Sequence, residues 1–349
     1  MIDPDYSFLD RTLHRLALHY APLADASFDL DQSTVRTDPS DIVSRRHVFV
    51  SGLARAGTTL LMRKFYATGL YRSLTYRDMP FVLAPNLWRR LSQVSRRDIE
   101  SAERAHGDTV LVDVDSPESL DEVFWRIFSG DEYLESNRLK PHSPDEDVVR
   151  KYVRYVNAIL SAHERPLDRY LSKNNNNILR LGTIHRAFPN ALILIPFRRP
   201  LQQAVSLFRQ HRRFSELQTR REFALTYMTW LAHHEFGLDH RPFQFERDVP
   251  CPYPADTLNH WLHIWCATYE WLERSKPQPA LFVCYEDLCL QPQTWMRLAE
   301  LADIPATHEV GEAFRLSERS LEGGFDRTLA DRAAAIHERL VTHARAALA

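Results

Sequence analysis

The stretch "HVFVSGLARAGTTLLMRKF", residues 47–65, has the residue types of an anion-binding loop. An apolar run leads to Gly52 and Gly57, and a helical pattern follows. Glycines let the backbone fold closely around an anion, and the first N–H groups of the helix point toward it. The G-x-x-x-x-G spacing matches an ATP-binding phosphate loop, but Thr58 stands at the lysine position and the cation, Arg55, comes earlier. The loop therefore lacks the cation that bridges the β- and γ-phosphates of ATP.

Two further apolar runs end in cations. "ALILIPF" is followed by Arg198, Arg199 and Pro200, and then by a helical pattern that carries Ser206, while "RYLSK" ends at Lys173. Taken alone, each of these cations is consistent with a solvated surface side chain. Arginine offers forked, charge-assisted donors to phosphate groups. Ligands of parallel sheets bind at the carboxyl ends of the strands. We therefore expect a site for an anion with more than one charged group, and we expect it to need no metal.

Apolar runs of strand length alternate with helical patterns along most of the chain. This alternation predicts an α/β fold with a central parallel sheet flanked by helices. With the G-x-x-x-x-G loop after the first strand, the expected fold resembles that of P-loop-containing nucleotide hydrolases. We expect one domain over residues 1–349, with a helical insertion over 79–170. Strands are predicted at 47–51, 169–173, 191–197 and 280–286, and helices at 8–19, 58–69, 177–188, 200–214, 255–275 and 293–304. The short run 109–114 is a further candidate strand.

The composition excludes several classes of partner. The formal charge of -2 over 349 residues gives no net attraction to nucleic acid or to an anionic membrane. None of the 4 cysteines forms a C-x-x-C pair, so neither a zinc site nor a disulfide framework is indicated. The first residues lack the pattern of a signal peptide, and the longest apolar run is too short to span a bilayer. We expect a cytoplasmic protein with no transmembrane segment.

Three stretches resemble the sulfotransferases that use 3′-phosphoadenosine 5′-phosphosulfate (PAPS). "ARAGTT" is similar to that family's 5′-phosphosulfate loop, P-[KR]-[SA]-G-T-T, and departs from it mainly by Ala54 in place of proline. "FPNALILIPFRRPLQQAVSLF" resembles the second element, F-P-x-A, a strand, R-x-P, and a serine eight residues after that arginine. "LFVCYEDL" resembles a weaker third stretch, V-x-Y-E-D-L. The resemblance covers roughly residues 46–304.

The resemblance implies a role for each matching residue. Arg55 and the loop residues Ala56, Gly57, Thr58 and Thr59 would hold the 5′-phosphosulfate, and Arg198 and Ser206 would hold the 3′-phosphate. Lys173 matches the family lysine that reaches the bridging oxygen or the sulfuryl group. Arg319 and Arg327, the first and last residues of "RSLEGGFDR", lie where the family often closes a loop over the nucleotide. PAPS would be the donor, 3′,5′-bisphosphoadenosine (PAP) the product, and no metal would be required.

The general base is the main open question. Many cytosolic members of the family place a histidine two residues after the strand-end lysine, but this chain has Asn175 there. Relatives that act on carbohydrate or on protein tyrosine often use a carboxylate shortly after the loop helix, which favours Asp78. Asp78 beside Arg77 is also consistent with a surface ion pair. Glu118 and Glu122 are second choices, and His106 is the third.

The acceptor expected from these features is a carbohydrate or glycoconjugate hydroxyl, with a small lipid or natural-product alcohol as the next option. The helices between residues 79 and 170 are expected to form the acceptor-side wall. Two other functions remain open. One is a P-loop kinase or NTPase, disfavoured by Thr58 and by the lack of a clear Walker B carboxylate; the other is a catalytically inactive nucleotide-binding protein of the same fold.

Overall fold

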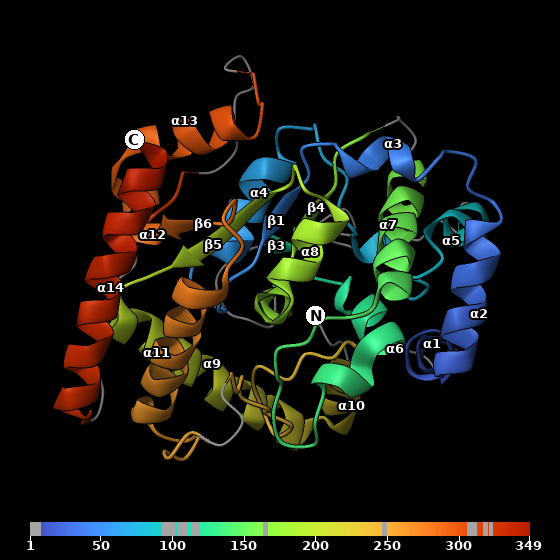
Figure 1. Ribbon diagram of the computed structural model, residues 1–349. Helices are drawn as coiled ribbons and strands as arrows, with labels where there is room; N and C mark the ends of the chain where they lie inside the picture. Colours follow the sequence, from blue (N-terminus) through green and yellow to red (C-terminus); the bar gives the residue numbers. More distant parts are fainter. Residues whose placement is uncertain are drawn as a thin grey trace.

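A central sheet of four parallel strands organises the protein (Figure 1). The computed structural model describes residues 8–92, 102–103, 111–112, 119–162, 167–245, 250–305, 313–316, 320 and 324–349. The strand order is β4-β1-β5-β6, and every neighbouring pair runs parallel. The strands are β1 (Val48–Val50), β4 (Leu171–Lys173), β5 (Leu192–Phe197) and β6 (Leu281–Cys284). The predicted α/β fold with a parallel sheet is confirmed.

Helices follow the strands as parallel crossovers require. Those of the sheet layers are α4 (Thr58–Tyr66), α8 (Leu181–Ala187), α9 (Pro200–Arg220), α10 (Glu222–Trp230), α11 (Leu258–Ser275), α12 (Tyr285–Leu290), α13 (Pro292–Leu301) and α14 (Arg327–Leu348). The N-terminal ones are α1 (Phe8–His14), a π-helical turn (Arg15–His19), α2 (Ala21–Gln32) and α3 (Ser40–Val43). The predicted helix at 8–19 is thus divided in two, whereas α9 extends beyond its predicted end.

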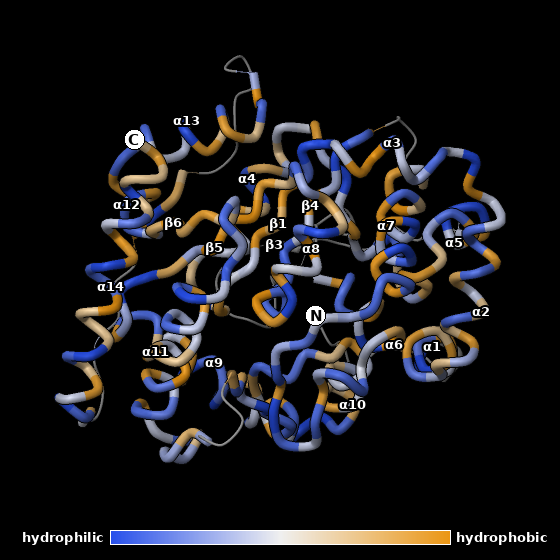
Figure 2. Tube along the Cα trace, viewed as in Figure 1, coloured by the Kyte–Doolittle hydropathy of each residue, from blue (hydrophilic) through white to orange (hydrophobic). Residues whose placement is uncertain are grey.

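Both faces of the sheet are buried, so successive strand residues enter two different cores. Val48 and Val50 pack in one cluster with α4 and α13, whereas Phe49, between them, belongs to the larger cluster on the opposite face. Side chains of a strand alternate between faces, which explains why these strands are apolar without interruption. Figure 2 shows the strands as an apolar centre and α14 as a helix of mixed polarity. The larger cluster contains residues from Leu18 to Ala344.

Helices of the region 79–170 lie at the β4 side of the sheet, opposite α14 (Figure 1). They are α5 (Pro85–Ser92), α6 (Glu122–Tyr133) and α7 (Glu146–Ser161), preceded by a 3₁₀ turn η2 (Tyr76–Asp78). The candidate strand at 109–114 appears as β3 (Leu111–Val112), which pairs antiparallel with β2 (Ala102–Glu103) outside the main sheet. Among the described residues, no helix has the length and apolar character needed to cross a membrane.

Candidate active site

The loop after β1 has the backbone of a close turn. Arg55 and Gly57 both have positive φ, 68° and 82°, and α4 begins directly afterwards at Thr58. A Cβ atom on Gly52 would lie 2.7 Å from the carbonyl oxygen of Pro196 on β5, so glycine allows the loop to approach that strand. Thr58 is buried and Thr59 half-buried at the start of α4. The first N–H groups of a helix have no acceptor within the helix and favour an anion.

Arg55 lies against the helix that follows β5. Its Nε donates a hydrogen bond to the Oγ of Ser206, at 3.0 Å. Ser206 is buried in the second turn of α9, and α9 begins two residues after Arg198. The two stretches singled out as nucleotide-binding elements therefore meet in space, although their residues are 151 positions apart in the chain.

Gln203 connects the same two stretches from inside. Its Nε2 donates to the carbonyl oxygen of Ala54 at 2.9 Å, while its Oε1 accepts from the backbone N–H of Arg198 at 3.2 Å. The indole N–H of Trp265 donates to the same Oε1, at 2.9 Å. Gln203 is fully buried, so these contacts fix the amide and hold the loop against the end of β5. Sequence reasoning missed Gln203; its place on the inner face of the helix beginning at Pro200 was the available signal.

The third element, "VCYEDL", packs under the loop and under Arg198. The Arg198 guanidinium lies 5.2 Å from the ring centroid of Tyr285, and a Cβ on Gly57 would lie 2.4 Å from that ring. Glu286 Oε1 accepts from the backbone N–H of Arg199 at 3.0 Å and lies 4.0 Å from Arg198 Nε. Arg198 is only 5 % exposed, and Tyr285 and Glu286 orient it from below. All three stretches of the resemblance thus lie together.

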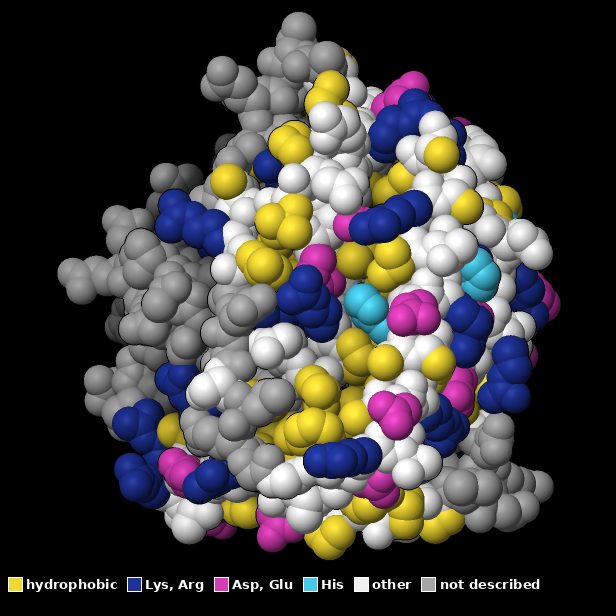
Figure 3. Space-filling model, turned by 90° about the vertical axis from the view of Figure 1, so that its left-hand side faces the viewer, with side chains coloured by type: hydrophobic (Ala, Val, Ile, Leu, Met, Phe, Trp, Pro, Cys, Tyr) yellow, Lys and Arg dark blue, Asp and Glu magenta, His cyan; other side chains and the backbone are white. Residues whose placement is uncertain are grey.

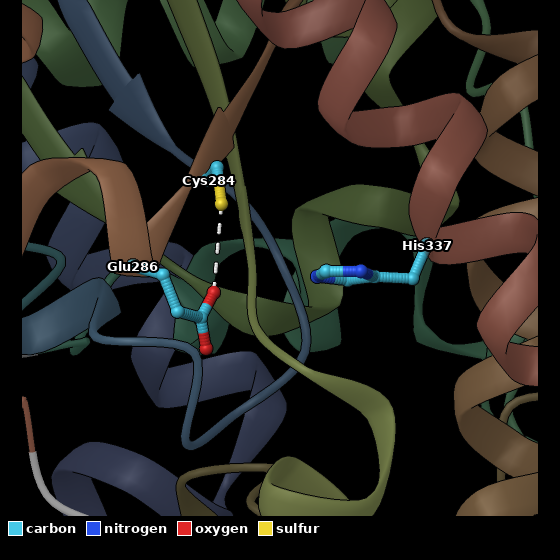
Figure 4. A group of neighbouring side chains, drawn as sticks. All are labelled: Cys284, Glu286 and His337. Atoms are coloured by element: carbon cyan, nitrogen blue, oxygen red, sulfur yellow. Dashed lines mark hydrogen bonds between the residues drawn. The ribbon is translucent and has the colours of Figure 1, made fainter.

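Glu286 also belongs to a compact group with Cys284 and His337. The thiol, carboxylate and imidazole atoms of the three side chains lie within 4.8 Å of one another (Figure 4). The Cys284 thiol donates to Glu286 Oε2 at 3.5 Å. Burial raises the pKa of Cys284 to about 12, so the thiol keeps its proton. Burial also lowers the pKa of His337, which keeps its ring neutral. The group therefore supports the Glu286 carboxylate that faces Arg198.

Lys173 comes to the same edge of the sheet. It is the last residue of β4 and pairs in register with Val50, the last residue of β1. The backbone N–H of Asn174 continues the ladder by donating to the carbonyl oxygen of Val50, at 3.2 Å. Lys173 is half-buried, as a cation that reaches into a site from its rim would be. Strand pairing thus places Lys173 beside the start of the Arg55 loop.

A buried polar network holds the turn after Lys173. Asn174 Nδ2 donates to Asp121 Oδ1 at 3.2 Å and to Glu122 Oε2 at 2.7 Å. Arg180 contacts both oxygens of Glu122, at 2.9 and 3.1 Å. Glu122, a second choice for the base, is fully buried and paired with Arg180. Its role as the base stays a prediction. Two adjacent carboxylates inside the apolar run "SLDEVFW" were the sequence signal for this network.

Asp78 is held in place by an ion pair and by hydrogen bonds within its own turn. It ends the turn η2, and its Oδ1 accepts from Arg72 Nη2 at 2.6 Å. Its Oδ2 accepts from the backbone N–H of Thr75 at 2.7 Å, in a capping box. Arg77 is therefore not the carboxylate's ion-pair partner; Arg72 is. Both carboxylate oxygens have donors, so accepting a proton would disrupt an existing contact. The base role of Asp78 stays a prediction.

Three other candidates lie outside the described residues: Glu118, His106 and Arg319. Ser320, next to Arg319, lies beside α9, where its carbonyl oxygen accepts from Arg209 Nη2 at 3.2 Å. Arg327 is the exposed first residue of α14, just after Asp326, whose side chain caps the helix. The nucleotide contacts expected of Arg319 and Arg327 stay predictions.

Charge is arranged locally in this protein. Figure 3 shows basic and acidic side chains interspersed among the described residues of one face. Three arginines of α14 have acidic partners: Arg332 with Glu270, Arg339 with Glu273 and Arg345 with Asp287. Lys173 ends β4, and Arg55 and Arg198 follow the neighbouring strands β1 and β5 at the same edge of the sheet. A candidate anion site at this edge of the sheet therefore depends on local charge, since the net charge of the chain is only -2.

Comparison with known proteins adds a family match. A family model described as "Sulfotransferase family" matches residues 47–308. No functionally curated protein matches the chain.

Two solved structures are similar at low sequence identity. Sulfotransferase STF9 from Mycobacterium avium has 18% identity and a TM-score of 0.45, over 98% of this chain and 79% of that one. Sulfotransferase STF1 from Mycobacterium tuberculosis H37Rv has 15% identity and a TM-score of 0.49, over 95% of this chain and 87% of that one.

Proposed function

This chain belongs to the sulfotransferase family, whose model spans most of its length, and we propose that it transfers a sulfuryl group from PAPS to an acceptor hydroxyl. The contact between Arg55 and Ser206 carries the proposal, because it joins the loop expected at the 5′-phosphosulfate to the helix expected at the 3′-phosphate. A ligand with anionic groups at both ends of its ribose matches cations from these two separate stretches.

The residues present fit such a donor. A glycine with φ of 82° sits at the start of α4, where a Cβ would strike Tyr285, so the backbone can turn tightly around a phosphate. Arg198 is buried at the end of β5 with its guanidinium over Tyr285, which leaves few rotamers for it to lose on binding. Charge-assisted hydrogen bonds of this kind contribute about 1.5–3 kcal/mol each.

In the proposed reaction the acceptor oxygen attacks sulfur in line and PAP leaves. Negative charge accumulates on the oxygen that bridged sulfur and phosphorus. Arg55 and Lys173 would stabilise that charge with fixed positive groups, a contribution that is usually the largest in such reactions. The early arginine thus replaces the lysine of an ATP-binding loop. Magnesium is not required in this scheme, because a sulfuryl group carries fewer charges than a γ-phosphoryl group.

For the acceptor we propose a carbohydrate or glycoconjugate hydroxyl. Asn175 stands where many cytosolic members have their histidine base, and an amide cannot accept a proton at neutral pH. Helices α5, α6 and α7 of the insertion would form the wall on the acceptor side. We further propose a cytoplasmic location, which fits four cysteines in the free thiol form.

A thermal-shift comparison of PAP with Mg-ATP tests the donor. We expect PAP at 100 times its dissociation constant to stabilise the fold by about 2.7 kcal/mol, with little effect of Mg-ATP. Stabilisation by Mg-ATP alone would favour a P-loop kinase or NTPase instead. Transfer of labelled sulfate from PAPS to a panel of glycans then tests the acceptor. Stabilisation by PAP without any transfer to glycans, lipid alcohols or small alcohols would indicate an inactive nucleotide-binding protein.

A further inference from the structure

The segment after α10 brings a carboxylate to the turn that follows Lys173. Asn175 Nδ2 donates to Glu235 Oε1 at 3.3 Å. Its neighbour Asn176 donates to the carbonyl oxygen of Ala232, also at 3.3 Å, so the two segments pack along more than one contact. Asn175 lies two residues after Lys173, the position at which a histidine base is expected in many cytosolic relatives. Here that position binds a glutamate from elsewhere in the chain.

Glu235 also lines a small pocket beside the Arg55 loop. Leu53 and Ala54, directly before Arg55, form one part of the lining, and Leu207, next to Ser206, forms another. The remaining walls are mainly apolar and include Phe236, Phe243 and Trp261. Glu235 is half-buried, so its carboxylate lies between the packed interior and the surface. The Glu235 carboxylate therefore lies close to residues that flank Arg55 and Lys173, the two cations expected at the sulfuryl group.

The backbone around Glu235 is held firmly. Asp239 accepts from both Nε and Nη2 of Arg241, each at 3.0 Å, and lies 3.0 Å from His234 Nδ1. The backbone N–H of Arg241 donates to the carbonyl oxygen of His234 at 2.9 Å. These contacts close a compact turn and fix the direction in which Glu235 leaves the backbone. Catalytic geometry depends on such support from neighbouring groups.

Among the residues that the structure describes, no cation pairs with the Glu235 carboxylate, which leaves it able to accept a proton. Its partner from the turn after β4 is the neutral amide of Asn175, whereas Asp78 and Glu122 are each bound to an arginine. On its own segment, Arg241 is engaged by Asp239 and by the carbonyl oxygen of Glu135. Burial lowers the pKa of His240, which also lines the pocket, to about 3, so this ring is neutral near pH 7.

We propose that Glu235 is the general base of the reaction and takes the proton of the acceptor hydroxyl. This inference rests on the proposed sulfuryl transfer. As the acceptor oxygen forms its bond to sulfur, the O–H proton passes to the Glu235 carboxylate. The bond between sulfur and the bridging oxygen breaks, and its electron pair leaves with PAP. The carboxylic acid of Glu235 then returns the proton to solvent.

The test compares Glu235→Gln with the wild type and with Glu216→Gln, which alters an exposed glutamate on α9. The acceptor is the compound that the wild type sulfates fastest in the transfer panel. We expect Glu235→Gln to lower kcat by about 10²–10⁴-fold, because a general base contributes that much. Stabilisation by PAP should stay at the wild-type level in both variants, since the proposal assigns Glu235 to the acceptor hydroxyl and not to the nucleotide. Glu216→Gln should match the wild type in both measurements.

A pH profile provides the second readout. The acidic limb of kcat/KM in the wild type should disappear in Glu235→Gln, while Glu235→Asp should keep a limb at reduced rate. Wild-type turnover in Glu235→Gln, or an unchanged acidic limb, would overturn the base assignment but leave sulfuryl transfer intact. Loss of PAP stabilisation in Glu235→Gln would also overturn it, by moving Glu235 to nucleotide binding or folding. Failure of PAP to stabilise the wild type would instead reject the proposed function itself.

Discussion

Arg55 Nε donates to the hydroxyl oxygen of Ser206 at 3.0 Å, and this contact joins the loop after β1 to the helix after β5. Gln203 reinforces the junction through Ala54 and Arg198. A ligand that binds one stretch is therefore in reach of the other, which is the basis of the first prediction.

Replacing Arg55 by alanine should weaken PAP binding. Removal of a charge-assisted contact worth about 1.5–3 kcal/mol corresponds to roughly a 10- to 150-fold increase in Kd. Arg198→Ala should have an effect of the same order at the other phosphate. Titration calorimetry with PAP measures both. Arg150→Ala, an exposed arginine of α7 paired with Asp147, is the matched control and should bind like the wild type. Equal affinities in all three variants would contradict the shared site.

Gly57→Ala should destabilise the fold and abolish stabilisation by PAP. Alanine at φ of 82° is strained, and its Cβ would lie 2.4 Å from the ring of Tyr285. Gly69→Ala is the control, because Gly69 has φ of 70° but no atom within 4 Å of an added Cβ. The strain alone costs about 1–2 kcal/mol.

Urea denaturation of the two glycine variants separates strain from the clash. We expect Gly69→Ala to lose about 1–2 kcal/mol and to keep its response to PAP. Gly57→Ala should lose more and should no longer respond to PAP. Equal losses, with PAP responses retained in both, would show that Tyr285 and the phosphate loop do not depend on the absence of a side chain at Gly57.

Asp78→Asn tests the buried ion pair with Arg72. Both side chains are 8% exposed, and breaking a buried pair typically costs about 3–5 kcal/mol because one charge is left uncompensated. We expect a lower free energy of unfolding in urea, with turnover per folded molecule near that of the wild type. A variant that keeps full stability and PAP binding but loses turnover would instead make Asp78 the base and argue against Glu235.

Stability should fall in mild acid through His47. Its Nδ1 accepts from the backbone N–H of Tyr170 at 2.8 Å, and its Nε2 lies 2.8 Å from the carbonyl oxygen of Ile42. Burial lowers the pKa of His47 from 6.5 to about 4, so the unfolded chain binds the proton first. The contribution is complete above pH 6.5 and is lost as pH falls toward 4, by roughly 3 kcal/mol in total.

Denaturation at pH 7.5 and at pH 5 measures this dependence. His47→Gln, which cannot be protonated, should be less stable at pH 7.5 but should lose less stability between the two values than the wild type. His343→Gln is the control, since His343 is exposed on α14. An identical loss in the wild type and His47→Gln would show that other groups carry the acid sensitivity.

Much of the fold followed from local patterns. Uninterrupted apolar runs such as residues 191–197, followed by helical periodicity, predicted a sheet covered on both faces, because strands buried on both sides need no polar face. Gly57 and Arg198 were singled out because turn residues and strand-end cations are recognisable within a few positions, whereas Ser206 was singled out by the family resemblance. The division of the first helix and the separate pairing of Leu111–Val112 depend on packing partners that no local pattern contains.

The sequence by itself determined the strands, the glycine-flanked loop after β1 and the cations at the strand ends, since each depends on neighbours within about ten residues. Tertiary structure alone decided which carboxylate is engaged and which is available. Asp78 is bound by Arg72, Glu122 by Arg180, and Glu235 meets Asn175 across 60 positions of chain. The physical reason is that a carboxylate's chemistry depends on the charges and donors around it, and these come from segments that only folding brings together.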